Sequence, residues 1–351
     1  MRDLANPSPK DTNMPKQPPY RTYLAHDHTQ RAQDLAQDRA GGVSGKILHL
    51  TVDSWIEAPT REQFEKSYYP YEGYLQRGLE AAAKVFRIVD DPKNKLRIIR
   101  TSSDLETAHS NGELAIILGN EGGKIIEESL GVLEAWWRLG LRHIQFNWAM
   151  RNQIADAQSN EDEKDRHGLT PFGFQVVERM NELGMVVDVS HSAPRTIKDV
   201  LRTTKKPILN SHSGSRTLAN KAQNLWDDQL RDMAANGGVV AMHFCSRLVI
   251  GVNDRQSEIP DVIRQIRYCV DKAGIDTIGL GPDWVLGDPE RDRNYLRNTS
   301  QESISWTKGL ETSAEMPNLL PALEKAGFHE SEIEKILGGN MLRLFRATLP
   351  K

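Results

Sequence analysis

Two short apolar runs constrain the fold of this chain most. Each ends in a histidine that is followed by a serine. Residues 184–191 read GMVVDVSH, and residues 206–212 read KPILNSH. A continuous apolar run of this length is typical of a strand buried on both faces in a parallel sheet. The carboxyl ends of such strands form the mouth where α/β folds place their chemistry. We therefore expect His191 and His212 to lie side by side and bind one metal ion; the alternative is two hydrogen-bonded core histidines.

Strand-like runs alternate with helical patterns along nearly the whole chain, in about eight strand–helix units. The expected strands are 21–28, 46–55, 96–101, 113–123, 142–150, 184–191, 206–212, 239–244 and 276–284. This alternation favours a parallel sheet with right-handed crossovers, and the count predicts a closed (β/α)8 TIM barrel. Residues 1–22, rich in Pro, Asn and Lys, are expected to form a flexible N-terminal leader, and residues 23–351 to form the barrel domain.

The composition narrows the classes of function. The formal net charge is −3 and there is no basic block, which argues against nucleic acid as a partner. No apolar stretch approaches the ~20 residues of a membrane span, and the N-terminus lacks the apolar core of a signal peptide. Two cysteines are too few for a disulfide framework. No glycine-rich nucleotide fingerprint opens a helix. We expect a soluble, cytoplasmic protein that binds a small-molecule substrate, with a homodimer among its expected states.

Two further patterns offer metal ligands. The run 113–123 delivers Glu121 to a glycine turn at the carboxyl end of an expected strand, so its carboxylate is a ligand candidate, with helix capping as the alternative. His26 and His28 form an H-x-H pair on the first expected strand. Side chains alternate along a strand, so both histidines would share one face and could chelate a metal. A solvated turn is the alternative for this short, polar run.

Five stretches of the chain resemble the membrane (renal) dipeptidase family, peptidase family M19, of the amidohydrolase superfamily. They are LGNEGGKIIEESLGVL, GLTPFGFQVVERMNELGMVVDVSHSAP, PILNSHSGSRTL, QNLWDDQLRDMAANGGVVAMHF and IGLGPDW, and the similarity covers roughly residues 35–345. The resemblance implies a (β/α)8 barrel that holds two Zn²⁺ ions, with a single ion as the alternative. It also implies that Glu121 bridges the metals, that His191 and His212 bind the second metal, and that Asp283 is the acid–base aspartate.

The chain departs from the pattern of the family at two positions near the expected metals. The family has H-x-D on its first strand, where this chain has His26-Asp27-His28, so that His28 replaces the aspartate. Trp148 stands where the family has a histidine that contacts the substrate and the oxyanion. An indole has one N–H donor and cannot accept a proton. His243, at another strand end, could replace that donor, with a packing role as the alternative.

Substrate recognition is expected to differ as well. Gln223 stands where the family has an arginine that grips the carboxylate of the substrate, and a neutral amide cannot reproduce that bidentate, charge-assisted pair. Arg216, Lys221 or Arg151 could restore the cation from another direction, and Asn152 is a further candidate substrate contact. We expect weaker binding of a free carboxylate, and a flat tryptophan wall that favours a bulkier acyl group.

These residues support three hypotheses. The first is a metal-dependent hydrolase that cleaves an amide bond of a dipeptide or similar small compound. A metal-bound water, with its pKa lowered towards ~7, would attack the carbonyl carbon, and Asp283 would transfer the proton. The second is a mononuclear enzyme of the same fold that acts on another small acid, by decarboxylation or by ester or lactone cleavage. The third is a catalytically inactive barrel that acts as a binding protein. Two, one or no equivalents of metal per chain would separate them.

Overall fold

Eight parallel strands close into a barrel in the computed structural model of this protein, which describes residues 21–27, 32–50, 73–148, 150–160, 168–252, 255–284 and 305–351. The strands are β1 (Thr22–Asp27), β2 (Val43–Leu50), β3 (Leu96–Ile98), β4 (Leu114–Glu121), β5 (Leu141–Gln145), β6 (Val186–Asp188), β7 (Leu209–Ser213), β8 (Val239–Met242) and β9 (Ile278–Leu280). The sheet order is β2-β1-β9-β8-β7-β6-β5-β4-β3, and an additional β2–β4 pairing closes the ring. The predicted (β/α)8 barrel is confirmed.

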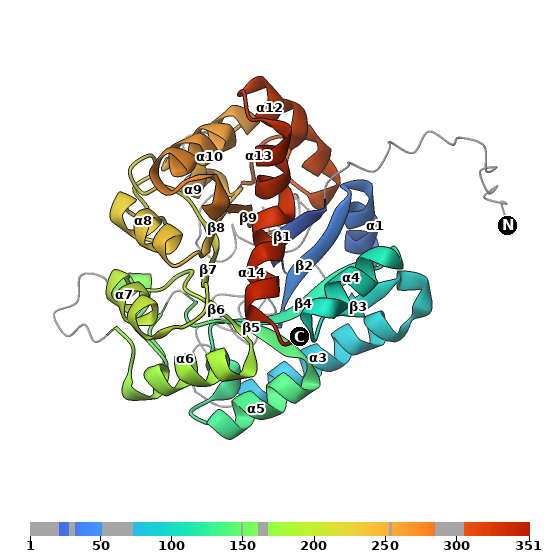
Figure 1. The fold of residues 1–351 in the computed structure, drawn as a ribbon, viewed down its shortest axis with the longest axis vertical. Helices are drawn as coiled ribbons and strands as arrows, with labels where there is room; N and C mark the ends of the chain where they lie inside the picture. Colours follow the sequence, from blue (N-terminus) through green and yellow to red (C-terminus); the bar gives the residue numbers. More distant parts are fainter. Residues whose placement is uncertain are drawn as a thin grey trace, which may run out of the picture.

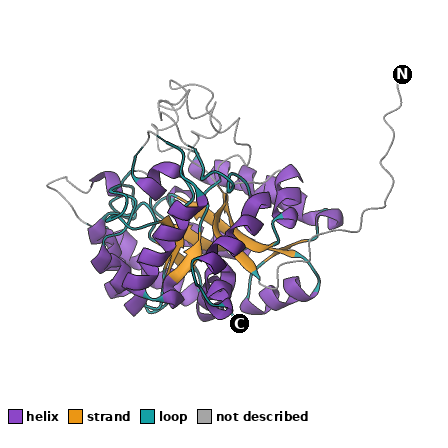
Figure 2. Cartoon of the chain, turned by 90° about the horizontal axis from the view of Figure 1, so that it is seen from above, coloured by secondary structure: helices purple, strands orange, loops and turns teal. Residues whose placement is uncertain are grey.

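Helices surround this barrel and follow the chain around it in sequence order (Figures 1 and 2). They are α1 (Ala32–Ala40), α3 (Tyr74–Asp90), α4 (Ser102–Ser110), α5 (Leu130–Leu139), α6 (Pro171–Leu183), α7 (Pro194–Thr203), α8 (Asp227–Ala235), α9 (Ser246–Ile250), α10 (Ile259–Ala273), α12 (Leu319–Lys325), α13 (Glu330–Glu334) and α14 (Asn340–Thr348). A π-helical turn, Lys335–Gly339, joins the last two. Short 3₁₀ turns lie at Pro92–Asn94, Lys124–Ile126, Gln158–Asn160, Ile275–Thr277 and Ser313–Asn318.

Alternation along the strands divides the apolar residues between two cores. On β4, Ile116 and Leu118 belong to the core between the strands and the outer helices, whereas Ala115 and Ile117 belong to a second core. This second core also contains Met341 and other residues of α14, which crosses one end of the barrel (Figure 1). Because α14 packs there against residues near the starts of the strands, the opposite end, where the strands finish, is left for a functional site.

Most strands are shorter than expected, for example Val186–Asp188 within 184–191 and Ile278–Leu280 within 276–284, and two differences affect the ring. The short β3 is a ninth strand that pairs with the amino-terminal end of β4 and is not part of the closed ring. The second strand is Val43–Leu50 instead of 46–55, and residues 51–72 lie outside the described residues. The barrel begins at Thr22, and residues 1–20 also lie outside the described residues, so the flexible leader stays a prediction.

None of the helices in the described part of the chain has the length and apolar character of a membrane span.

Candidate metal centre

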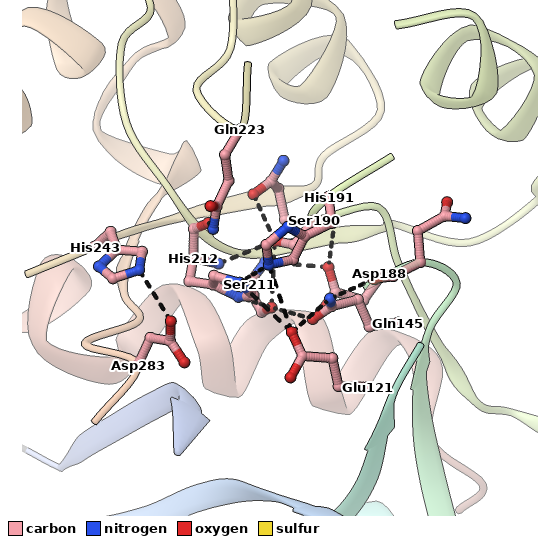
Figure 3. A network of polar contacts seen from close by, with 12 residues as sticks. Glu121, Gln145, Asp188, Ser190, His191, Ser211, His212, Gln223, His243 and Asp283 are labelled. Atoms are coloured by element: carbon pink, nitrogen blue, oxygen red, sulfur yellow. Dashed lines mark hydrogen bonds and ion pairs between the residues drawn. The ribbon is translucent and has the colours of Figure 1, made fainter. Parts of the chain in front are cut away.

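Three potential ligands from β4, β6 and β7 meet at the carboxyl ends of the barrel strands (Figure 3). Glu121 is the last residue of β4, His191 follows β6, and His212 lies on β7. Their ligand atoms all lie within 4.8 Å of one another. The Nε2 atoms of the two histidines are 2.9 Å apart, and Glu121 Oε1 lies 3.5 Å from His191 Nε2 and 3.9 Å from His212 Nε2. The convergence predicted for the three residues is therefore found.

The chemistry of these three groups fits a divalent metal ion. Two imidazoles and a carboxylate form a donor set typical of protein-bound zinc. Burial, as the largest cause, lowers the pKa of His191 to about 4, so its imidazole is neutral at pH 7. A neutral imidazole is the form that binds a metal. His191 Nε2 faces the other two ligands, so the three side chains suit a divalent metal ion.

Two neighbouring side chains hold the ligands in place. Ser211 Oγ lies 2.9 Å from His212 Nδ1, which leaves Nε2 of that imidazole to face the other ligands. Gln145, the last residue of β5, donates from Nε2 to Glu121 Oε1 over 3.0 Å. Ser211 Oγ also donates to Gln145 Oε1 over 3.4 Å, so the two supports are themselves connected. Sequence reasoning did not find either of them.

Asp188, at the end of β6, joins the two strands that carry the histidines. Its Oδ1 accepts the backbone N–H groups of Ser190 at 2.9 Å and Ser211 at 3.1 Å. Its Oδ2 lies 2.8 Å from Nε2 of His143 on β5. The backbones of β6 and β7 share only one paired position, Asp188 with Leu209, so this side chain adds polar contact between them, together with Ser190 Oγ, which accepts the N–H of His212. Sequence reasoning missed this residue as well.

Two residues of the site have a left-handed backbone. The φ angle is 62° at His191 and 58° at Asp283, and only two other non-glycine residues among those described, Lys95 and Glu127, have positive φ. This conformation costs a residue other than glycine about 1–3 kcal/mol and is concentrated at functional sites. The surrounding packing therefore holds both side chains where an unstrained backbone would not.

His243 orients Asp283, which lies across the barrel mouth from Glu121 (Figure 3). His243 Nδ1 accepts the backbone N–H of Cys245 at 2.8 Å, so the proton of the neutral ring is on Nε2. That N–H donates to Asp283 Oδ2 over 3.0 Å. The Nε2 N–H of His243 is thus directed at Asp283, and a contact of His243 with an oxyanion stays a prediction. The alternative role of His243, as a packing residue, does not account for its hydrogen bond to Asp283.

Two of the expected substrate contacts lie on the loop that follows β5. Trp148 is largely buried and forms an isolated bridge with Met150. The amide of Asn152 donates to the backbone oxygens of Gly122 and Phe146, and its Oδ1 accepts the N–H groups of the two residues that follow Gln153. Asn152 therefore shapes this loop, and its contact with substrate stays a prediction.

The other expected contacts lie beside β7. Gln223 donates from Nε2 to the backbone oxygen of His212 over 3.2 Å. The guanidinium of Arg216 stacks 4.7 Å above the ring of Trp226, and its Nε donates to Asn220 Oδ1 over 3.1 Å. Gln223, Arg216 and His191 all line one narrow recess. The structure thus places Gln223 and Arg216 next to the candidate metal centre.

The first strand of the barrel carries the expected H-x-H pair. The strand β1 pairs with β2 and β9, so the backbone of His26 approaches the same barrel end as Glu121. The side chain of His26 and the whole of His28 lie outside the described residues. A second metal position therefore stays a prediction.

Comparisons with known proteins agree with this geometry. The family model described as membrane dipeptidase (peptidase family M19) matches residues 11–349. The "Uncharacterized dipeptidase C965.12" of Schizosaccharomyces pombe is 33% identical over 319 residues, which cover 90% of this chain and 72% of that protein. Dipeptidase tcpJ of Claviceps purpurea is 26% identical over 336 residues, which cover 93% and 73%.

Solved structures share the fold. An amidohydrolase from Pseudomonas aeruginosa superposes with a TM-score of 0.80 at 22% identity, covering 94% of this chain and 96% of that one. A metallo peptidase from Rhodobacter sphaeroides, liganded with a phosphinate mimic of the dipeptide L-Ala-D-Ala, has a TM-score of 0.75 at 20% identity, covering 94% and 99%. The family match and the fission-yeast relative show that this chain belongs to the membrane dipeptidase family, peptidase family M19, as a metal-dependent hydrolase of small-molecule substrates.

Proposed function

We propose that this enzyme cleaves the amide bond of a dipeptide or a similar small compound, and that its metal is zinc held by Glu121, His191 and His212. The observation that carries the proposal is the meeting of these three ligand atoms within 4.8 Å at the mouth of the barrel. Zinc in such a site supplies a Lewis acid that polarises a carbonyl and activates water. The dipeptide mimic bound by the structural relative from Rhodobacter supports this substrate class.

Asp283 is the proposed acid–base group. Its carboxylate reaches the mouth from the end of β9, and one oxygen is held by His243 Nε2 over 3.0 Å. A carboxylate in this position can accept a proton from the attacking water and return it to the leaving nitrogen. His243 keeps the carboxylate oriented and stabilises its charged form through this hydrogen bond. The hydrogen bond from Cys245 in turn fixes the tautomer of His243.

His26 and His28 are proposed to hold a second zinc ion, with Glu121 shared between the two ions. The support is the position of β1 in the ring, beside β2, which pairs with β4 up to Leu50 and Asn120. A first strand in that position ends close to the end of β4, where Glu121 lies. The proposal therefore predicts two equivalents of zinc per chain.

Gln223, Arg216, Trp148 and Asn152 are proposed to shape the substrate pocket. The recess that joins Gln223 and Arg216 to His191 supports this for the first two residues. The position of the other two, on the loop directly after β5, supports a wall of the mouth beside Glu121.

Elemental analysis of the purified enzyme and a panel of dipeptides test this function. We expect zinc and dipeptide hydrolysis in the wild type, and loss of both in His212→Ala. His109→Ala, which changes an exposed histidine on α4, is the matched control and should keep both. One equivalent of metal would favour the mononuclear alternative. A zinc-loaded enzyme that hydrolyses no dipeptide would contradict the proposed substrate class.

A further inference from the structure

A hydrogen bond from a tryptophan side chain holds the backbone on each side of Asp283, the proposed acid–base group. The indole N–H of Trp306 donates to the backbone oxygen of Pro282 over 3.2 Å. The indole N–H of Trp284 donates to the backbone oxygen of Leu310 over 3.1 Å. Pro282 and Trp284 are the residues directly before and after Asp283, and both indoles are buried. The two bonds therefore connect both neighbours of Asp283 to one segment, residues 305–310.

The 305–310 segment is also bound to the chain that follows β8. The backbone N–H and the hydroxyl of Thr307 both donate to the backbone oxygen of Phe244, over 2.8 Å and 2.9 Å. The segment forms an isolated antiparallel bridge at Cys245 as well. Phe244 and Cys245 directly follow His243, whose Nε2 orients the acid–base carboxylate. One segment thus holds the backbone beside both members of this hydrogen-bonded pair.

A cluster of buried hydroxyl groups anchors the 305–310 segment. Ser257 Oγ lies 2.8 Å from Thr307 Oγ1 and 3.0 Å from Ser246 Oγ. Ser305 Oγ donates to Ser246 Oγ over 3.0 Å. Ser257 and Thr307 are fully buried, so water does not compete for these bonds. The segment is therefore a fixed support for the indole of Trp306.

We infer that Trp306 is a positioning residue of the reaction, which holds Asp283 in its productive orientation through the backbone oxygen of Pro282. This inference rests on the proposed function, in which Asp283 transfers the proton. The φ angle of Asp283 is 58°, a strained conformation that persists only where the surrounding structure enforces it. The bond from Trp306 restrains the backbone before Asp283, and the bond from Trp284 restrains it afterwards. A small displacement of a proton-transfer group slows the chemical step more than it weakens substrate binding.

The first test is the kinetics of Trp306→Phe, which keeps a buried aromatic ring and removes the indole N–H. We expect kcat for dipeptide hydrolysis by the metal-loaded enzyme to fall about 10- to 100-fold, while KM and the metal content stay close to those of the wild type. Trp284→Phe removes the bond on the other side of Asp283 and should lower kcat in the same way. It tests the same restraint independently of the folding of Trp306→Phe.

Trp136→Phe is the matched control. Trp136, on α5, is also buried, and its indole N–H donates to the backbone oxygen of Ile125 over 3.1 Å. The control loses the same kind of hydrogen bond and the same ring volume, so it should lose similar stability and keep the kcat of the wild type. A fall of kcat in the control equal to that in Trp306→Phe would reduce Trp306 to a structural role and overturn the inference.

The second test needs no substrate. In NMR spectra of the metal-loaded enzyme, the Nε2 proton of His243 should exchange slowly with water, because it is held by Asp283. Trp306→Phe should speed this exchange at least about tenfold, and Trp136→Phe should leave it unchanged. An unchanged exchange rate or an unchanged kcat in Trp306→Phe would overturn the inference. A wild type that hydrolyses no dipeptide would instead refute the proposed function, and the exchange rates would still decide whether Trp306 positions Asp283.

Discussion

Replacing Asp188 with alanine should destabilise the barrel strongly even without metal. The carboxylate accepts backbone N–H groups from Ser190 and Ser211 and contacts His143 Nε2, and all of these residues are fully buried. Alanine would leave three buried polar groups unsatisfied, at about 1–3 kcal/mol each, or about 3–9 kcal/mol in total. The free energy of unfolding of a whole domain is about 5–15 kcal/mol, so the variant should be close to unfolding at 25 °C.

Urea unfolding in excess chelator measures this effect without any contribution from bound metal. Asp188→Asn keeps an oxygen for the two backbone N–H groups and disturbs only the contact with His143, so it should lose about 1–3 kcal/mol. Asp276→Ala is the control, because Asp276 forms an exposed ion pair with Lys335 and should lose less than about 1 kcal/mol. If Asp188→Ala were as stable as this control, the proposed role of Asp188 in joining β6 to β7 would be refuted.

Three further outcomes are expected. Asp283→Asn should lower kcat by roughly 10²- to 10⁴-fold with the metal content unchanged, and a loss of metal would place Asp283 among the ligands instead. Burial raises the thiol pKa of Cys245, and that of Cys269 to about 12, so at pH 8 both stay protonated in the native enzyme. A thiol reagent should then modify neither cysteine until the protein unfolds, and rapid labelling of the native enzyme would argue against this burial. Adding zinc at a hundred times its Kd to the chelated protein should stabilise it by about 2.7 kcal/mol, seen as a rise in Tm, whereas His212→Ala should show no such rise.

The main ligands could be predicted because each ends an apolar run. His191, His212 and Glu121 follow stretches that only a buried strand explains, and parallel strands bring their ends together. The pattern predicted this meeting point without any knowledge of the loops. The ring of eight strands followed from the same alternation of strands and helices.

The supports of the site could not be predicted in the same way. Asp188 and Gln145 lie within or at the end of strands, and their partners come from neighbouring strands that are distant in the sequence. Which strands become neighbours, and in which register, is decided by the closing of the barrel. The role of His243 was missed for a more local reason, since a backbone N–H at Cys245 decides which nitrogen carries the proton.

The ninth strand shows another limit of sequence patterns. Residues 96–98 have the apolar character of a strand, and the structure contains a strand there. Its pairing is restricted to the first three residues of β4, whereas β2 pairs with β4 along six positions. Composition cannot distinguish a strand that closes a ring from one that pairs beside it.

Because His191 and Asp283 have left-handed backbones, selection of variants for higher stability would favour their replacement. Glycine adopts this conformation without strain, so glycine at either position would relieve a cost of about 1–3 kcal/mol. Selection for heat resistance without an activity assay would therefore tend to accept such substitutions, and each would remove a side chain that we propose as a metal ligand or acid–base group. On the proposed roles of His191 and Asp283, a variant selected for stability alone would gain stability and lose activity.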